Sequence, residues 1–416
     1  MSSVRRNFVV LMTLQISTYV VPLLTLPWLT RILSPGGYGQ LSFALAFTMY
    51  FVTFSNYGFY LTATPQIAIH RHDRTQRSKI FWATFLAQAL IMATGFVVLL
   101  ALTLIFKRLA DDRELLVIGY GMVFGAILLP TWYFQGVEDL RVISGLVFIG
   151  RALSVPAMFL LVRGKGDIYW AMGVNATVPT LSGIGVFIYL FARREVEFVR
   201  VPLSDIFAVI RDGWRVFMAT AVADFYASSN TVVLALISGN VAAGYFAAGD
   251  KLIRAALGML SPLKTAAYPH ISYLMHHARE DAFAFLRKML VVQGVIVFTM
   301  SLAIFLSAPY AVKILYGPQF LPTVDVLRWM AFVPFMAGLT DVLGVQTMLP
   351  LGLKVQFSRV LLASGVLNFS VLIVLAKLFA APGAAATVLI TETMIVMAMA
   401  YTLSLQGVGL LKRQVA

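Results

Sequence analysis

Apolar residues occur along this chain in long runs that are separated by short polar segments. The runs reach the length of roughly 20 residues that a helix needs to cross the hydrocarbon core of a membrane. The pattern therefore predicts an all-α integral membrane protein with about twelve transmembrane helices. The expected spans are residues 8–31, 40–62, 80–106, 115–136, 142–163, 168–192, 213–237, 242–268, 289–312, 324–349, 356–379 and 383–406.

The composition agrees with a lipid environment. Of the 416 residues, 60% are apolar and only 12% are charged, whereas soluble proteins average roughly 45–50% and about 25%. A soluble fold of this size could not bury so much apolar surface. The net charge of +14 does not indicate nucleic-acid binding, because the chain has no compact basic domain and no basic–aromatic motif.

The basic residues lie mostly between the spans and indicate the orientation. If both termini are cytoplasmic, the cytoplasmic segments hold about twice as many Lys and Arg residues as the external ones. The start of the chain resembles the charged end of a signal peptide, but the following apolar run has no small-residue cleavage site. We therefore expect a retained first span and two cytoplasmic termini.

The two halves of the sequence resemble each other. Residues 63–68 match residues 267–272, and the same offset relates the expected hinge at 32–36 to that at 236–240. Six spans per half would give two copies in the same orientation. We expect an N-terminal six-helix lobe at 1–192, a cytoplasmic linker at 193–212 and a C-terminal six-helix lobe at 213–416.

The sequence offers little for catalysis. Its expected external loops are short, and an enzyme acting on external sugars would need a larger folded loop. It has no cysteine, no phosphate-cradling Gly-rich loop followed by Lys, and no metal-ligand spacing. The histidines fall at expected loop positions: His70, His72, His270, His276 and His277. We expect a protein that moves a substrate across the membrane, without a cofactor or a metal.

Charged residues inside the spans are the informative ones, because a centred Lys, Arg or Asp costs roughly 2.5–3.5 kcal/mol on insertion scales. Asp250, Lys251 and Arg254 lie close together on one expected span. Asp250 and Arg254 share a helical face and could simply pair within the bundle. However, Lys251 would stay unpaired, and the repeat has only apolar residues at the equivalent positions. This asymmetry favours a cationic site.

Among the other charged residues within expected spans, four are informative. Asp224 and Glu392 either have buried hydrogen-bonding partners or couple transport to protons. Arg151 either contributes to a site, snorkels to the interface or pairs with another residue. Asp341 lies late in its span and could reach the cytoplasmic interface. Two other patterns are structural: Gly121 and Gly125 predict close helix packing, and prolines such as Pro22 and Pro27 predict kinked spans.

Several segments resemble one family of transporters. The segment LSPGGYGQLSFA at 33–44 looks like the opening motif of the Wzx-type, or O-antigen, flippases of lipid-linked oligosaccharides. The segments LYGPQF at 315–320 and LRWMAFVP at 327–334 are similar to later parts of these proteins, as are GVQTM at 344–348 and PGAAA at 382–386. The resemblance covers nearly the whole chain, and its motifs are mainly structural.

The resemblance implies two six-helix lobes around a central cavity, as in the MATE-like superfamily to which these flippases belong. It implies an undecaprenyl-diphosphate-linked oligosaccharide as cargo, alternating access, a bacterial inner-membrane location, and membrane lipids and other polysaccharide-assembly proteins as partners. Lys251 and Arg254 would contact the diphosphate, with Arg31 and Arg151 as helpers. Asp224, Asp250 and Glu392 are the candidate carboxylates for ion coupling.

Two other functions stay open at this point. A multidrug or cation antiporter of the same fold would be expected to have acidic cavity residues, but residues 8–31 contain no Asp or Glu. A polytopic polysaccharide polymerase or ligase should have a large external loop, which this chain lacks. The lipid II flippase has two additional helices, for which 416 residues leave no room.

Overall fold

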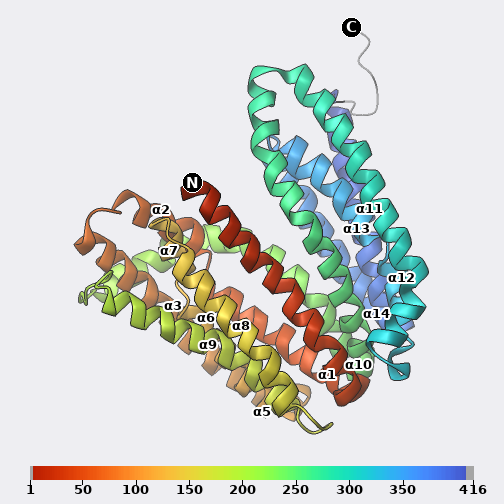
Figure 1. Ribbon diagram of the computed structural model, residues 1–416, viewed down its shortest axis with the longest axis horizontal. Coiled ribbons are helices and arrows are strands. Elements are labelled where there is room, and N and C mark those ends of the chain that lie inside the picture. Colours follow the sequence, from red (N-terminus) through yellow and green to blue (C-terminus); the bar gives the residue numbers. More distant parts are fainter. Residues whose placement is uncertain (1–2, 409–416) are drawn as a thin grey trace. The chain divides into compact units, whose positions relative to one another are not determined.

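The protein is described here by a computed structural model that covers residues 3–408. Within that range the side chains of 3–20, 219–224, 226–227 and 260–266 lie outside the described part. All regular elements in the described residues are helices (Figure 1). The predicted all-α class is confirmed.

The chain forms two compact units, divided between Val232 and Val233. The expected division into two lobes with a linker at 193–212 stays a prediction. Unit 1 contains α1 (Ser3–Asn56), α2 (Phe59–Ile69), α3 (Arg74–Ile105), α4 (Lys107–Asp111), α5 (Arg113–Gly119), α6 (Gly121–Ile127), α7 (Thr131–Gly136), α8 (Arg141–Leu161), α9 (Ile168–Ala192) and the first part of α10 (Leu203–His277).

Unit 2 contains the rest of α10 and the elements that follow it. These are α11 (Arg279–Leu315), the 3-10 helix η1 (Pro318–Phe320), α12 (Thr323–Met330), α13 (Val333–Thr340), the π-helix η2 (Asp341–Met348) and α14 (Lys354–Leu405).

Eight helical segments among the described residues are long and apolar enough to cross a membrane. Three long helices are broken by a residue with non-helical backbone: Ser34 in α1, Gly239 in α10 and Ala380 in α14. Each break falls between two expected spans, so twelve spans are compatible with the structure. The breaks at Ser34 and Gly239 confirm both predicted hinges. At Ser34 the next residue is Pro35, which disfavours helical backbone before it.

Close contact between α6 and α9 forms part of the core of unit 1. A Cβ atom at Gly125 would lie 2.5 Å from the backbone nitrogen of Thr180, and one at Gly121 would lie 3.0 Å from Cβ of Ala176. Only glycine allows the two backbones to approach this closely. The close packing predicted for Gly121 and Gly125 is confirmed.

The first part of α10 packs onto α1 inside unit 1. The rings of Tyr57 and Phe217 stack with centroids 4.7 Å apart, and the hydroxyl groups of Tyr50 and Ser229 lie 3.0 Å apart. Aromatic pairs of this kind add stability beyond the area that they bury. These contacts explain why unit 1 extends to Val232.

The second part of α10 packs against α12 in unit 2. A Cβ atom at Gly249 would lie 2.8 Å from Cγ1 of Val326, so the two helices are in close contact there. The hydroxyl group of Tyr316 donates a hydrogen bond to the carbonyl oxygen of Ala248, at 3.0 Å. These contacts fix which face of α10 turns toward the core of unit 2.

Candidate functional site

The candidate site lies on the opposite face of α10. Ala248 and Ile253 are buried, whereas Lys251 and Arg254 are exposed. At 3.6 residues per turn, these two pairs fall on different sides of the helix. Arg254 comes 15 residues after the break at Gly239, roughly 22 Å along the helix at 1.5 Å per residue, and therefore lies well inside the expected span 242–268.

Asp250 and Arg254 form the expected pair. Nε of Arg254 lies 2.5 Å from Oδ2 of Asp250, and the exposed fractions of their side chains are 45% and 17%. Lys251 makes no ion pair with any residue that the structure describes. The ion pair thus neutralises the carboxylate of Asp250. It leaves the ammonium group of Lys251 available for an anion.

The energetic argument for a cavity follows from this exposure. Lys251 and the Arg254 guanidinium point away from the core of unit 2, within a helix that is apolar enough to span a membrane. Each cation would cost roughly 2.5–3.5 kcal/mol against hydrocarbon. We therefore expect this face to meet protein, water or a polar ligand rather than lipid tails.

Arg31 and Arg151 belong to unit 1. Arg31 is exposed and lies one turn before the break at Ser34. Arg151 is half-buried in α8, and its carbonyl oxygen accepts a hydrogen bond from Ser154 at 2.6 Å. Both arginines take part in further contacts. Their proposed role as helpers at the diphosphate stays a prediction.

The carboxylates have different surroundings. The side chain of Asp224 lies outside the described residues. Glu392 is half-buried in α14 and has a contact partner. Asp341 is buried, at 4% exposure, and its expected place near the cytoplasmic interface stays a prediction. Asp341 opens the π-helix η2. The wider turn of a π-helix changes the side on which each residue falls, and hydropathy does not reveal it.

Sequence reasoning missed the buried amide side chains of unit 2. Gln293 on α11 is 1% exposed and donates a hydrogen bond to the carbonyl oxygen of Gly338, at 3.2 Å. Asn368 is equally buried and donates to Thr391 Oγ1, at 3.0 Å. An amide inside an apolar run is the signal that could have found them, because polar groups in hydrocarbon need partners.

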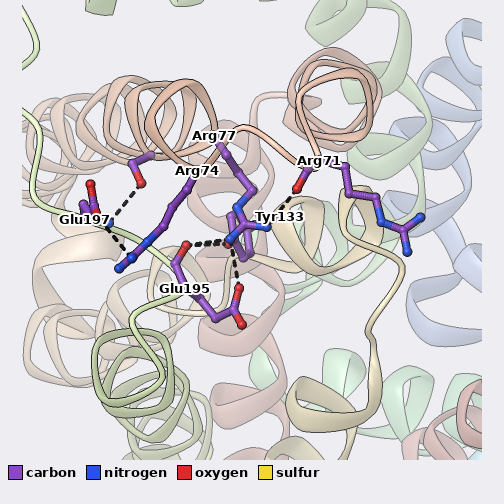
Figure 2. Close-up of polar contacts among 7 residues, drawn as sticks. Arg71, Arg74, Arg77, Tyr133, Glu195 and Glu197 are labelled. Carbon is purple, nitrogen blue, oxygen red and sulfur yellow. Dashed lines mark hydrogen bonds and ion pairs between the residues drawn. The ribbon is translucent and has the colours of Figure 1, made fainter.

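The chain that follows α9 is tied to the start of α3 by ion pairs, which Figure 2 shows in part. Glu195 accepts from Arg77 and Glu197 pairs with Arg74, at 2.9 and 3.0 Å. The backbone N–H of Glu197 also donates to Ser78 Oγ, at 2.9 Å. We call the pairs of Arg74 and Arg77 with Glu197 and Glu195 the linker clasp. They hold the first residues of the expected linker onto unit 1.

Solved structures with a similar fold are transporters. A multidrug resistance MATE family transporter of the MOP superfamily, in an inward-facing conformation, aligns with a TM-score of 0.67 and 13% identity, over 96% of this chain and 98% of that one. The lipid II flippase MurJ, in an inward closed conformation, aligns with a TM-score of 0.63 and 11% identity, over 92% and 87%. At these identities the similarity establishes a MATE-like fold.

Sequence comparisons identify the family. A protein of Escherichia coli (strain K12) named "Putative O-antigen transporter" is 30% identical over 94% of this chain and 95% of its own length. A protein of the same name from Shigella dysenteriae is 25% identical over 95% and 98%. The family model described as "Polysaccharide biosynthesis protein" matches residues 4–275. This chain therefore belongs to the polysaccharide biosynthesis protein family, as the motifs around Ser34 and Tyr316 suggested.

Proposed function

We propose that this protein is a flippase for a lipid-linked oligosaccharide. Its cargo is a repeat unit of O-antigen or of another polysaccharide on undecaprenyl diphosphate. The protein moves it from the cytoplasmic to the periplasmic leaflet of the bacterial inner membrane. The family and the two relatives named as O-antigen transporters support the class of cargo. The fold shared with MATE transporters supports transport by conformational change.

The observation that carries this proposal is the exposed cationic face of α10. Lys251 and Arg254 place positive charge in the middle of an otherwise apolar span. A diphosphate needs such charge, because charge-assisted hydrogen bonds to phosphate oxygens are about twice as strong as neutral ones. A cationic drug would instead be repelled by this face.

The chemistry of the cargo determines by which route each of its parts crosses or stays in the membrane. Sugar hydroxyl groups cannot be desolvated cheaply in lipid, so the glycan crosses through a polar cavity. The polyprenyl tail stays in the bilayer. The protein therefore opens alternately to each side and also laterally to the membrane. The first span, in which Pro22 and Pro27 predict a bend, is the proposed gate.

Ion coupling is part of the proposal. One charge that crosses a potential of 100 mV is worth about 2.3 kcal/mol, enough to bias a near-balanced step. Asp250, beside the cationic residues, and the carboxyl groups of Asp224 and Glu392 are the candidates to carry the proton. In vesicles, Asp224→Asn should weaken the dependence of transport on a proton gradient. Transport by the unmodified protein that ignores the gradient would exclude this coupling.

The test of the proposed function uses the purified full-length protein in vesicles. Radiolabelled undecaprenyl-diphosphate oligosaccharide is placed in the inner leaflet, and its arrival outside is measured with an added glycosidase. The unmodified protein should accelerate arrival, and Lys251→Ala should lower the rate at least tenfold, about 1.4 kcal/mol. Lys377→Ala, which removes an exposed cation from α14, is the matched control. An unmodified protein that exports a cationic dye and leaves the oligosaccharide in place would overturn the proposal.

A further inference from the structure

A surface groove runs between α8 and α9, which lie side by side in unit 1 (Figure 1). Its volume is about 330 Å³. Both helices are apolar enough to cross a membrane, so the groove opens at membrane depth. Exposed apolar side chains form its rims, among them Leu153 and Leu181, which are 63% and 61% exposed. Small residues such as Gly150 and Gly173 form part of its wall.

The wall of the groove is suited to hydrocarbon. Ser154 and Ser182 line it, but each hydroxyl group already donates to a backbone carbonyl of α8, at 2.6 and 3.2 Å. Thr177 supplies the remaining hydroxyl group. Water in this groove would find few hydrogen-bonding partners, so an apolar chain is the better occupant.

Positive charge lies at one end of the groove. Leu161 and Trp170 line that end, and the loop between them carries Arg163 and Lys165, both exposed. Neither cation has an ion pair within the part of the chain that is described. The loop's carboxylate, on Asp167, accepts hydrogen bonds from the backbone N–H groups of Arg163 and Gly164 instead. The combination of an apolar groove and a cationic end fits a lipid with a phosphate head.

The length of the groove distinguishes between kinds of lipid. On α8 its lining extends from Leu146 to Leu161, roughly 22 Å at the helical rise. One leaflet supplies only about half of the roughly 30 Å hydrocarbon core. A phospholipid tail would end near the bilayer midplane and leave the far part of the groove empty. A longer chain would fill the groove.

We propose that this groove binds the polyprenyl tail of a lipid-linked substrate, with the phosphate groups near Arg163 and Lys165. The identity of the tail rests on the proposed function. In the expected orientation the loop that carries Arg163 is periplasmic, so the groove holds the lipid after its head group has crossed.

The chain offers a matched pair of variants. A Cβ atom at Gly173 would meet nothing within 4 Å, so Gly173→Leu can fill the groove without a clash in helix packing. Gly145 on α8 has the same open surroundings but does not line the groove. Gly145→Leu therefore adds the same side chain to the same pair of helices and leaves the groove open.

The experiment measures binding separately from translocation. Undecaprenyl diphosphate with a benzophenone on its tail is photo-cross-linked to the full-length protein in phosphatidylethanolamine vesicles. Labelled peptides are then mapped. Labelling should fall on α8 and α9, drop about tenfold in Gly173→Leu, which corresponds to about 1.4 kcal/mol, and stay unchanged in Gly145→Leu. Arg163→Ala with Lys165→Ala should weaken labelling by the diphosphate probe but not by the tagged polyprenol without phosphate.

Unlabelled competitors distinguish a polyprenyl lipid from an ordinary phospholipid as the occupant of the groove. Unlabelled undecaprenyl diphosphate should displace the probe, whereas excess phosphatidylglycerol should not. Equal displacement by phosphatidylglycerol, or unchanged labelling in Gly173→Leu, would overturn the groove as a polyprenyl site. Normal flipping without labelling at α8 and α9 would reject the groove alone. Labelling there by a protein that flips no oligosaccharide would reject the proposed function alone.

Discussion

Arg77 Nη2 lies 2.9 Å from Glu195 Oε2 and also 2.9 Å from the carbonyl oxygen of Glu195. One guanidinium group therefore holds both the side chain and the backbone of a residue 118 positions later in the chain. The side chain of Arg77 is only 12% exposed, and its guanidinium lies over the ring of Tyr133, 5.7 Å from the centroid. This contact is the best shielded part of the linker clasp.

Arg77→Gln should loosen the linker and lower the free energy of unfolding by about 1–2 kcal/mol, because hydrogen bonds to charged groups are lost in a partly buried place. Trypsin should then cut faster after Arg200, in the segment between α9 and α10. Lys79→Gln removes the more exposed pair with Asp205 and should cost at most about 0.5 kcal/mol. Equal effects of the two changes on cleavage and on thermal unfolding in detergent would contradict a special role for Arg77.

Arg254→Ala should lower the stability of the protein, whereas Lys251→Ala should impair transport without changing stability. Removal of Arg254 leaves the carboxylate of Asp250, which is 17% exposed, without this ion pair. The protein should then unfold at a lower temperature, because an uncompensated charge in a low-dielectric place is costly. Lys251→Ala breaks no ion pair and should leave the melting temperature unchanged while transport is lost. Asp250→Asn combined with Arg254→Ala should restore the melting temperature, and a failure to do so would argue against the pair as its cause.

Substitutions at the breaks in α1 and α10 should shift the melting temperature in opposite directions. Ser34 has φ 63° and ψ 166°, and Gly239 has φ 84° and ψ 175°. This backbone region is essentially restricted to glycine and costs other residues about 1–3 kcal/mol. Ser34→Gly should raise the melting temperature, and Gly239→Ala should lower it although a Cβ atom there meets nothing within 4 Å. Circular dichroism melts would show whether the two shifts have opposite signs.

Gly125→Ala should destabilise unit 1 by about 1–3 kcal/mol, the usual cost of overpacking. Its Cβ atom would lie 2.5 Å from the backbone nitrogen of Thr180 and 2.7 Å from the carbonyl carbon of Pro179, and backbone atoms cannot rotate away. Gly145→Ala, which meets nothing within 4 Å, is the control for the change in helix propensity. If both variants melt at the temperature of the unmodified protein, α6 and α9 are less closely packed than described.

The sequence predicted the elements better than their packing. Long apolar runs gave the helices, and local chemistry gave the break before Pro35 and the contact at Gly125. The pairing of Asp250 with Arg254 followed from a spacing of four residues. These features depend on neighbours in the chain, which a sequence displays directly.

Features that depend on distant contacts could not be predicted. Hydropathy does not show that Phe217 stacks on Tyr57, or that Glu195 folds back to Arg77. Hydropathy also does not reveal that a π-helix starts at Asp341, or that the side chain of Asp341 is buried. The groove between α8 and α9 depends on how two helix faces meet, which no single span encodes.

The contact between Phe217 and Tyr57 has a consequence for biosynthesis. Unit 1 contains residues up to Val232, so it cannot complete its packing when α9 leaves the ribosome. Roughly 40 more residues must be translated, which takes about 2–8 seconds at 5–20 residues per second. During that interval Tyr50 on α1 and Tyr57 just after it lack the part of α10 that covers them in the complete unit. Nascent chains stalled just after α9 should therefore be the ones that membrane chaperones and proteases recognise.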